Sequence, residues 1–308
     1  MQPKRIAVIG AGLMGHGIAQ AFAGAGLPVS IHDADPARRA GVPGRIRESL
    51  GQLGDDPAAA DRVTPAETLA AAVADADVVI EAVPEDLELK KRLFAEIEAA
   101  APPYALLASN TSVIPITQIM AGLTYRRRAM GTHWWNPPHQ IPLVEVVQAE
   151  DTGEAEVAVM MALLAGIGKK PVHVRRDVPG FIGNRLQHAL WREAIALVQA
   201  GVCDAATVDE VVKESFGRRL SVLGPLENAD LVGTDLTLSV HRYVLHDLDR
   251  TPGPLRLLEE LVAAGRLGMK TGGGFRDWTE AEAQAVRTRL ADHLRRFDVY
   301  DTTKETTT

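Results

Sequence analysis

The sequence of 308 residues lacks several features that would assign it to large classes of proteins. It has one cysteine, Cys203, which excludes an internal disulfide and fits a reducing compartment. Its net charge of −7 offers no electrostatic footprint for nucleic acid or an anionic membrane. No stretch approaches the ~18 apolar residues of a spanning helix, and no histidine, cysteine or acidic cluster has metal-ligand spacing. These absences predict a soluble cytoplasmic protein without a metal, and without nucleic-acid or membrane partners.

Three glycines near the N-terminus follow a short apolar run. Residues 6–9 (IAVI) are too few for a helix and are typical of a buried parallel strand, and Gly10, Gly12 and Gly15 follow as G-x-G-x-x-G. The first glycine permits a tight turn, the second lets a pyrophosphate approach the backbone, and the third lets the next helix pack close to the sheet. Free N–H groups at the start of that helix attract phosphate. The segment predicts a dinucleotide-binding turn, with a glycine-rich turn that binds nothing as the alternative.

A carboxylate at the end of the second expected strand supports this prediction. Residues 28–33 (PVSIHD) end in Asp33, eighteen residues after Gly15, where an acid accepts hydrogen bonds from the adenosine ribose hydroxyls. Because the same charge repels a 2′-phosphate, NAD is favoured over NADP. Arg38 and Arg39 are the local counter-argument, and we expect them on a solvated helix face. The residues expected to bind NAD in this part of the chain are Gly10, Gly12, Leu13, Met14, Gly15 and Asp33.

Strand and helix patterns alternate in the first part of the chain and give way to helices alone in the second. Residues 34–77 contain four prolines that break them into short helical pieces, whereas 181–200 has helical periodicity throughout. The alternation predicts an α/β fold, in which a Rossmann-type doubly wound sheet at 1–178 binds NAD and an all-helical C-terminal domain follows at 179–308. Ligands are expected at the carboxyl ends of the strands, in a cleft between the domains. Residues 302–308 are expected to form a polar, frayed tail. Further strands are expected at 77–83, 105–108, 128–134, 143–148 and 171–176, and a helix at 86–100.

Four polar residues fall where the strands of the first domain open onto the expected cleft. They are Ser109 at the head of an S-N-T-S run, His133 at a strand end, Glu145 inside the apolar strand LVEVV, and Asn184 in the first turn of the C-terminal helices. An acid in an apolar strand is expensive to bury unless it is paired, and His133 lies twelve residues before Glu145 across a proline-rich loop. A carboxylate on one imidazole nitrogen fixes the tautomer and leaves the other nitrogen free to take a proton from an alcohol. Taken singly, a structural histidine and an outward-facing acid are the alternatives.

Seven motifs, in their order and spacing, resemble the 3-hydroxyacyl-CoA dehydrogenase family over nearly the whole chain. They are GAGLMGHGIAQ, EAVPEDLELKKRLF, ASNTS, GTHWWNP…LVEVV, DVPGFIGNRL, GPLE and GMKTGGGF. The resemblance implies an NAD-dependent dehydrogenase that oxidises the secondary 3-hydroxyl of a 3-hydroxyacyl substrate, with His133 and Glu145 as its general-base pair. It implies that Ser109 and Asn184 hydrogen-bond the reacting oxygen or the histidine, and that a homodimer forms through the helical domain. It also places Glu85 and Lys90 near the nicotinamide half of NAD and Asn110 among the NAD-binding residues. Asn136 is implied to shape the histidine loop.

Two departures from the family pattern leave the substrate open. Members that act on CoA esters carry a longer, lysine-rich helical segment after the second strand, whereas residues 33–77 contain no lysine. The loop NPPHQIPLVEV, together with GFIGNRLQ and GPLE, looks more like a small-acid branch that includes L-gulonate 3-dehydrogenase and L-carnitine dehydrogenase. The alternatives are therefore a CoA ester, as in fatty acid metabolism, a free acid such as a pyridine carboxylate, and a non-catalytic NAD-binding role. A compact acid would use donors such as Ser109, Ser112, Asn184 and His139. We expect His139 to be a surface loop residue, with a position facing the cleft as the alternative. The cations available for a nucleotide phosphate are Arg38, Arg39, Arg45, Arg47 and Arg62.

Overall fold

The computed structural model describes residues 3–302, with side chains to residue 296. Beyond its first residue, the polar tail expected at 302–308 lies outside the described residues. The chain forms two compact units. The first contains the residues up to Arg185 together with the C-terminal segment that begins at His293, and the second is Leu186–Asp292. None of the described helices combines the length and apolar character needed to cross a membrane.

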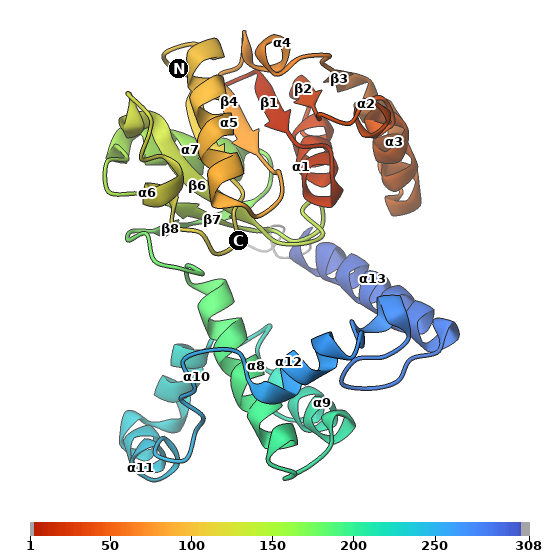
Figure 1. Ribbon diagram of the computed structural model, residues 1–308, viewed down its shortest axis with the longest axis vertical. Helices are drawn as coiled ribbons and strands as arrows, with labels where there is room; N and C mark the ends of the chain where they lie inside the picture. The colour runs from red at the N-terminus through yellow and green to blue at the C-terminus, as the bar shows by residue number, and fades with distance from the viewer. Residues whose placement is uncertain (1–2, 303–308) are drawn as a thin grey trace. The chain divides into compact units, whose positions relative to one another are not determined.

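An eight-stranded sheet organises the first unit (Figure 1). Neighbouring strands are parallel at every described pairing except one, between β6 and β7. The strand order reverses at β1, which lies between β2 and β4, and such a switch point leaves a crevice for ligands at the carboxyl ends of the strands. The Rossmann-type α/β fold is thereby confirmed. From edge to edge the strands are β3 (Val63–Pro65), β2 (Val29–His32), β1 (Ile6–Ile9), β4 (Val78–Glu81), β5 (Leu106–Ser109), β6 (Ala129–Trp134), β7 (Leu143–Val147) and β8 (Lys170–Val174).

Helices cover both faces of this sheet. One core includes Phe22 of α1 and Leu164 of α7, and the other includes Phe94 of α5 and Ile119 of α6. Strands covered on both faces are apolar on both, which explains the continuous apolar run of Ile6–Ile9. The helices of this unit are α1 (Leu13–Gly24), α2 (Pro36–Ala40), α3 (Val42–Leu53), α4 (Leu69–Val73), α5 (Leu87–Ala100), α6 (Ile116–Ile119) and α7 (Glu154–Gly166).

The segment between β2 and β4 is more ordered than the sequence pattern indicates. Helices α2, α3 and α4 and the 3₁₀ turn Pro57–Arg62 match the short helical pieces expected there, but the chain also forms β3. This strand pairs with β2 through three residues at the edge of the sheet. Three residues that end in a proline carry no alternating signal, so the pattern missed the strand.

The chain reverses direction between β6 and β7. Because these two strands are antiparallel, His133 and Glu145 are direct partners across the ladder. β8 then continues parallel to β7. The reversal places two residues that are twelve apart in sequence side by side, at the carboxyl end of β6.

The second unit is built from helices. Its first helix, α8, begins at Gly183 rather than at the expected residue 181, because Gly180 and Phe181 have left-handed φ angles of +74° and +50° that a right-handed helix excludes. Among the described residues of 186–292, the buried apolar side chains are Leu255 and Ala283, in contrast to the two cores that flank the sheet. The helices are α8 (Gly183–Gln199), α9 (Ala205–Glu214), α10 (Pro225–Val232), α11 (Thr234–Val244), α12 (Arg256–Ala263) and α13 (Glu280–Thr302).

Candidate active site

His133 and Glu145 form a buried hydrogen-bonded pair. The imidazole Nδ1 lies 2.7 Å from Glu145 Oε2, and the two residues are 3% and 0% exposed. The other carboxylate oxygen, Oε1, accepts hydrogen bonds from the backbone N–H groups of Ile182 (2.9 Å) and Gly183 (3.1 Å) at the start of α8. Burial alone would raise the pKa of Glu145, but the hydrogen bonds from His133, Gly183 and Ile182 outweigh it and hold that pKa below its usual value of 4.5. The carboxylate is therefore ionised at neutral pH.

This pair can accept a proton from a substrate. An ionised Glu145 accepts the Nδ1–H of His133, which leaves the lone pair of Nε2 for a proton. The rings of Trp135 and Phe181 flank the imidazole at centroid distances of 5.2 and 5.6 Å and limit its rotation. The arrangement is that of an oriented general base.

Asn184 is buried beside this pair. It follows Gly183 directly, and its side-chain Nδ2 donates to the backbone carbonyl of Ser112 at 2.9 Å. Asn110 makes a second link between strand ends, since its Oδ1 accepts from the backbone N–H of Trp134 at 2.9 Å. The S-N-T-S run after β5 is thus joined both to the end of β6 and to the start of α8.

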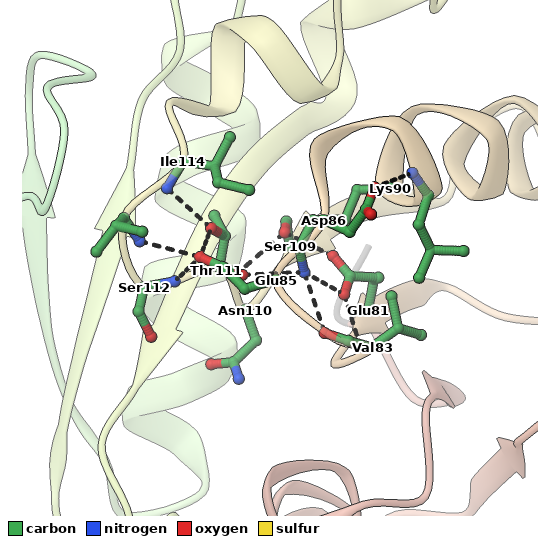
Figure 2. Close-up of polar contacts among 12 residues, drawn as sticks. Glu81, Val83, Glu85, Asp86, Lys90, Ser109, Asn110, Thr111, Ser112 and Ile114 are labelled. Atoms are coloured by element: carbon green, nitrogen blue, oxygen red, sulfur yellow. Dashed lines mark hydrogen bonds and ion pairs between the residues drawn. The ribbon is translucent and has the colours of Figure 1, made fainter. Parts of the chain in front are cut away.

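Ser109 takes part in a buried charged network with Glu81 and Lys90 (Figure 2). Glu81 ends β4 and Ser109 ends β5, and the two residues are partners in the parallel ladder. The Ser109 hydroxyl donates to Glu81 Oε2 at 2.6 Å, and Lys90 Nζ lies 2.6 Å from Glu81 Oε1. All three residues are at most 1% exposed as whole residues or side chains.

Glu85 is the exposed member of the same network. Its side chain is 36% exposed and lies 3.4 Å from Lys90 Nζ. Its carboxylate accepts hydrogen bonds from the Thr111 hydroxyl and from the backbone N–H groups of Ser112 (3.0 Å) and Val113 (3.2 Å), as Figure 2 shows. Partial burial acts to raise the pKa of Glu85, but these hydrogen bonds and the Lys90 charge lower it overall. Glu85 therefore presents an ionised carboxylate to solvent.

The glycine-rich turn between β1 and α1 has the backbone that a dinucleotide needs. Gly10 has φ +104°, and a Cβ there would lie 2.6 Å from the carbonyl oxygen of Ala82 at the end of β4. A Cβ at Gly12 would meet no atom within 4 Å, so this stretch of backbone is open to a ligand. A Cβ at Gly15 would strike the backbone of Gly10. Next to the turn, Leu13 is exposed and Met14 is half-buried.

Asp33 lies against this turn at the end of β2. Its Oδ2 accepts the backbone N–H of Ala11 at 2.7 Å, and its Oδ1 accepts that of Asp35 at 2.9 Å. The residue is half-buried. A carboxylate held in this way next to an open glycine backbone fits the adenosine half of NAD.

The loop between β6 and β7 is packed against helix α1, since a Cβ at Gly17 would lie 2.6 Å from the ring of Pro138. Lys169 Nζ donates to the carbonyl oxygens of Pro138 (2.7 Å) and Ile141 (3.0 Å) and so ties the loop to the start of β8. His139 was expected to be a surface loop residue, but it is half-buried. Burial, with the nearby charges of His16 and Lys169, lowers its pKa to about 4. His139 is therefore neutral at neutral pH. Asn136, expected to shape this loop, is exposed.

The arginines after β2 are engaged within the first unit. Arg39, expected on a solvated face, is half-buried and donates to the Asp33 carbonyl oxygen, while Arg45 reaches back to the carbonyl of Ala11 at the glycine turn. The contacts are Arg38–Asp35 (3.4 Å), Arg39–Asp33 (2.7 Å), Arg45–Ala11 (2.9 Å), Arg47–Asp61 (2.5 Å) and Arg62–Ala23 (3.0 Å).

Two family models match the chain. Residues 5–178 match 3-hydroxyacyl-CoA dehydrogenase, NAD binding domain, and residues 180–278 match 3-hydroxyacyl-CoA dehydrogenase, C-terminal domain. The chain belongs to the 3-hydroxyacyl-CoA dehydrogenase family. It is an NAD-dependent dehydrogenase that acts on CH–OH groups.

Relatives within the 3-hydroxyacyl-CoA dehydrogenase family differ in substrate. The chain is 36% identical to 5-formyl-3-hydroxy-2-methylpyridine 4-carboxylate 5-dehydrogenase of Mesorhizobium japonicum, covering 94% of this chain and 96% of that one. It is 38% identical to a probable 3-hydroxybutyryl-CoA dehydrogenase of Bacillus subtilis, covering 91% and 99%. A crystal structure of a 5-formyl-3-hydroxy-2-methylpyridine 4-carboxylic acid 5-dehydrogenase, an NAD-dependent dismutase, superposes with a TM-score of 0.89 at 34% identity, covering 96% and 97%.

Glu81 is the residue of this site that the sequence pattern did not single out. It stands among apolar neighbours in VVIEAV, which is the same signal that drew attention to Glu145 in LVEVV. Lys90 was expected near the nicotinamide half of NAD through the family resemblance, but the structure surrounds its ammonium with protein acceptors.

Proposed function

We propose that this dehydrogenase oxidises the secondary 3-hydroxyl of a 3-hydroxyacyl substrate to a 3-oxo group, with His133 as the general base. The buried His133–Glu145 hydrogen bond carries the proposal, because it directs Nε2 to accept the hydroxyl proton. Glu145 then stabilises the imidazolium that forms. NAD, when bound, accepts the hydride from the same carbon.

Asn184 and Ser109 are proposed to set the hydrogen bonds around the reacting hydroxyl. Asn184 uses one of its two amide N–H donors on the Ser112 carbonyl, and its side-chain oxygen is left to accept a hydrogen bond from substrate or from protonated His133. Ser109 lies at the end of the neighbouring strand β5. Both residues belong to the same unit as the pair.

The NAD contacts are proposed along the switch point of the sheet. Gly10, Gly12 and Gly15, with Leu13 and Met14 beside them, would hold the pyrophosphate. Asp33 would accept the adenosine ribose hydroxyls, and the exposed Glu85 carboxylate, with Asn110 nearby in the S-N-T-S run, would meet the nicotinamide half. In this proposal Lys90 acts through Glu85, its ion-pair partner.

A compact free acid is the second candidate substrate. A CoA ester brings several phosphates that need cations, yet all five arginines after β2 hold partners within the first unit. A small acid needs only donors near His133, such as Ser112 or His139. The relative from Mesorhizobium, whose name gives a pyridine carboxylate substrate, supports the same candidate. A CoA-ester preference would instead place the enzyme in fatty acid metabolism.

The helical unit is proposed to form a homodimer. Its helices leave large apolar side chains exposed, among them Leu226 of α10 and Tyr243 of α11 at 79% and 85%. An apolar pocket of about 640 Å³, lined by residues of α8, α9 and α12 that include Trp191, lies within the same unit. Apolar area of this kind marks protein–protein contacts. The single cysteine further supports a cytoplasmic location.

A substrate panel tests the proposal. NADH formation is measured with 3-hydroxybutyryl-CoA, free 3-hydroxybutyrate, gulonate and carnitine, each with the unmodified enzyme and with His133→Gln. A substrate that the unmodified enzyme oxidises and the variant does not identifies the class. Absence of NADH formation with every 3-hydroxy compound would contradict the proposal.

The same panel separates the two substrate candidates. A variant with Arg38 and Arg47 changed to alanine should keep its kcat/KM on a free acid within about threefold, because these two side chains pair with Asp35 and Asp61 and not with the glycine turn or Asp33. A large advantage for the thioester that this variant loses would favour the CoA ester.

A further inference from the structure

The ammonium of Lys90 is held by protein groups. Lys90 Nζ donates to Glu81 Oε1 at 2.6 Å and to the Val83 carbonyl at 3.3 Å, and it forms an ion pair with Glu85 Oε2 at 3.4 Å. The side chain is 1% exposed. Lys90 therefore influences a ligand through the carboxylates that it holds, and Glu81 supplies the shortest of its contacts.

Glu81 uses both carboxylate oxygens within the network. Oε1 accepts from Lys90 and from the backbone N–H of Val83 at 2.7 Å, while Oε2 accepts from the Ser109 hydroxyl at 2.6 Å. Three donors converge on the group, and both of its oxygens act as acceptors. Figure 2 shows Glu81 beside Ser109 and Val83.

The direction of the Ser109 proton follows from this contact. A hydroxyl has one donor and two acceptor sites; the proton of Ser109 goes to Glu81, and one acceptor site takes the backbone N–H of Thr111 at 3.2 Å. One acceptor site remains. Ser109 in this state is a hydrogen-bond acceptor, and it has no proton to give to a ketone.

We propose that Glu81 is a positioning residue of this dehydrogenase, which keeps Ser109 as a hydrogen-bond acceptor and holds Lys90, and through it Glu85, in place for NAD. The inference rests on the proposed function for its account of the substrate. Burying an ion pair does not by itself stabilise a fold relative to apolar packing. The location of this pair, at the switch point and beside the glycine-rich turn, gives it a role in ligand binding.

The first test is NADH binding, measured by fluorescence titration without substrate. Glu81→Gln should weaken NADH by on the order of 10-fold, and Lys90→Met should add little in the double variant, because both act through one contact. Glu98→Gln is the matched control. Glu98 lies on α5, the helix that carries Lys90, where it pairs with Arg128 and accepts two backbone N–H groups. Wild-type NADH affinity in Glu81→Gln would overturn the proposal.

Thermal unfolding of the same variants separates positioning from stability. Glu81→Gln leaves a buried ammonium short of a partner, whereas Glu81→Gln with Lys90→Met removes both charges and should recover the unfolding temperature. The double variant should stay weak for NADH although it is stable. Recovery of affinity along with stability would show a structural role alone and overturn the proposal.

The second test addresses Ser109 through the alcohol and ketone of one substrate pair. In Glu81→Gln the serine proton is released, so the 3-oxo product should bind more tightly relative to the 3-hydroxy substrate by roughly 10-fold, and Ser109→Ala should abolish that change. An unaltered product-to-substrate ratio would overturn the Ser109 assignment. If the proposed function is wrong, the unmodified protein binds NADH and oxidises no 3-hydroxy compound, and the NADH titrations still decide the role of Glu81.

Discussion

Two glutamates lie among apolar neighbours in the sheet, Glu81 in β4 and Glu145 in β7, and they have different partners. Both are 0% exposed, and each uses both of its oxygens as acceptors. Glu81 is paired with Lys90, and Glu145 is paired with His133, which belongs to the side-chain type that most often exchanges protons in catalysis. The lysine pair suits permanent positioning, and the histidine pair suits proton transfer.

The comparison extends to the second oxygen of each carboxylate. Glu145 binds two backbone N–H groups at the start of α8, whereas Glu81 binds one backbone N–H and the Ser109 side chain. Backbone donors orient the His133–Glu145 pair, whereas the side-chain contact of Glu81 orients the hydroxyl of Ser109. Glu145 thus connects His133 to the backbone, whereas Glu81 connects two side chains, Lys90 and Ser109.

The largest effect is expected from removing the proton acceptor. His133→Gln should lower kcat by about 10²–10⁴-fold through loss of general-base catalysis, with NADH affinity little changed, since NAD contacts are assigned elsewhere. Steady-state kinetics and fluorescence titration measure the two quantities. Near-normal turnover in the variant would show that His133 is not the base.

Glu145→Gln should act through the same unit. Its effect on kcat should be non-additive with that of His133→Gln, because the two residues work as one. A double-variant cycle in kcat checks this. Losses that multiply across the cycle would separate the carboxylate from the histidine.

Acid unfolding should distinguish Glu145 from a carboxylate without partners. Because the native pKa of Glu145 is lowered, its contribution to stability is present above the unfolded-state pKa and is lost as pH falls through the native one. Glu145→Gln should therefore flatten the decline of the unfolding temperature below about pH 5. Calorimetry of both proteins across the acid range measures the slopes. Parallel curves would contradict the ionised pair.

A smaller effect is expected at the exposed end of the lysine network. Glu85→Gln should weaken NADH by roughly 5–10-fold through loss of a charged acceptor, while kcat at saturating NAD changes by less than about threefold. Glu88→Gln, an exposed acid in the first turn of α5, is the matched control. An equal loss of kcat would place Glu85 in the chemical step.

The smallest effect of the series concerns the choice between NAD and NADP at Asp33, a carboxylate that takes no part in the Glu81–Lys90 network. Asp33→Ala should weaken NAD and narrow its advantage over NADP, since the charge that repels a 2′-phosphate is gone. Initial rates with both cofactors give the ratio. Equal use of NAD and NADP by the unmodified protein would refute this role for Asp33.

The sequence was sufficient to predict the fold because its signals are local. The glycine turn, the acid at the end of β2 and the βαβ alternation each arise within a few residues, and strand β3 escaped because its three residues carry no period. The His133–Glu145 contact was predictable since a charge in an apolar strand requires a partner. The antiparallel return that aligns them across the ladder was not signalled by composition.

The lysine network was harder to predict because it depends on helix phase. The sequence pattern of α5 predicts an apolar face of Leu89, Leu93, Phe94 and Ile97. Phe94 and Ile97 are indeed buried, but the third buried position of the helix is Lys90. A lysine at the centre of a buried face calls for a buried acid, and only the ladder pairing of β4 with β5 shows that Glu81 meets both Lys90 and Ser109. Register between distant strands is not written in either strand alone.

The backbone donors of Glu145 affect how this site tolerates mutation. Every amino acid except proline supplies an N–H, so the bond from residue 182 survives almost any substitution there, and Ile182 is itself half-exposed. Gly183 has less freedom, because a Cβ would strike the ring of Trp135. Substitutions at residue 182 can therefore change the protein surface there while the backbone hydrogen bond that orients Glu145, and with it His133, is kept.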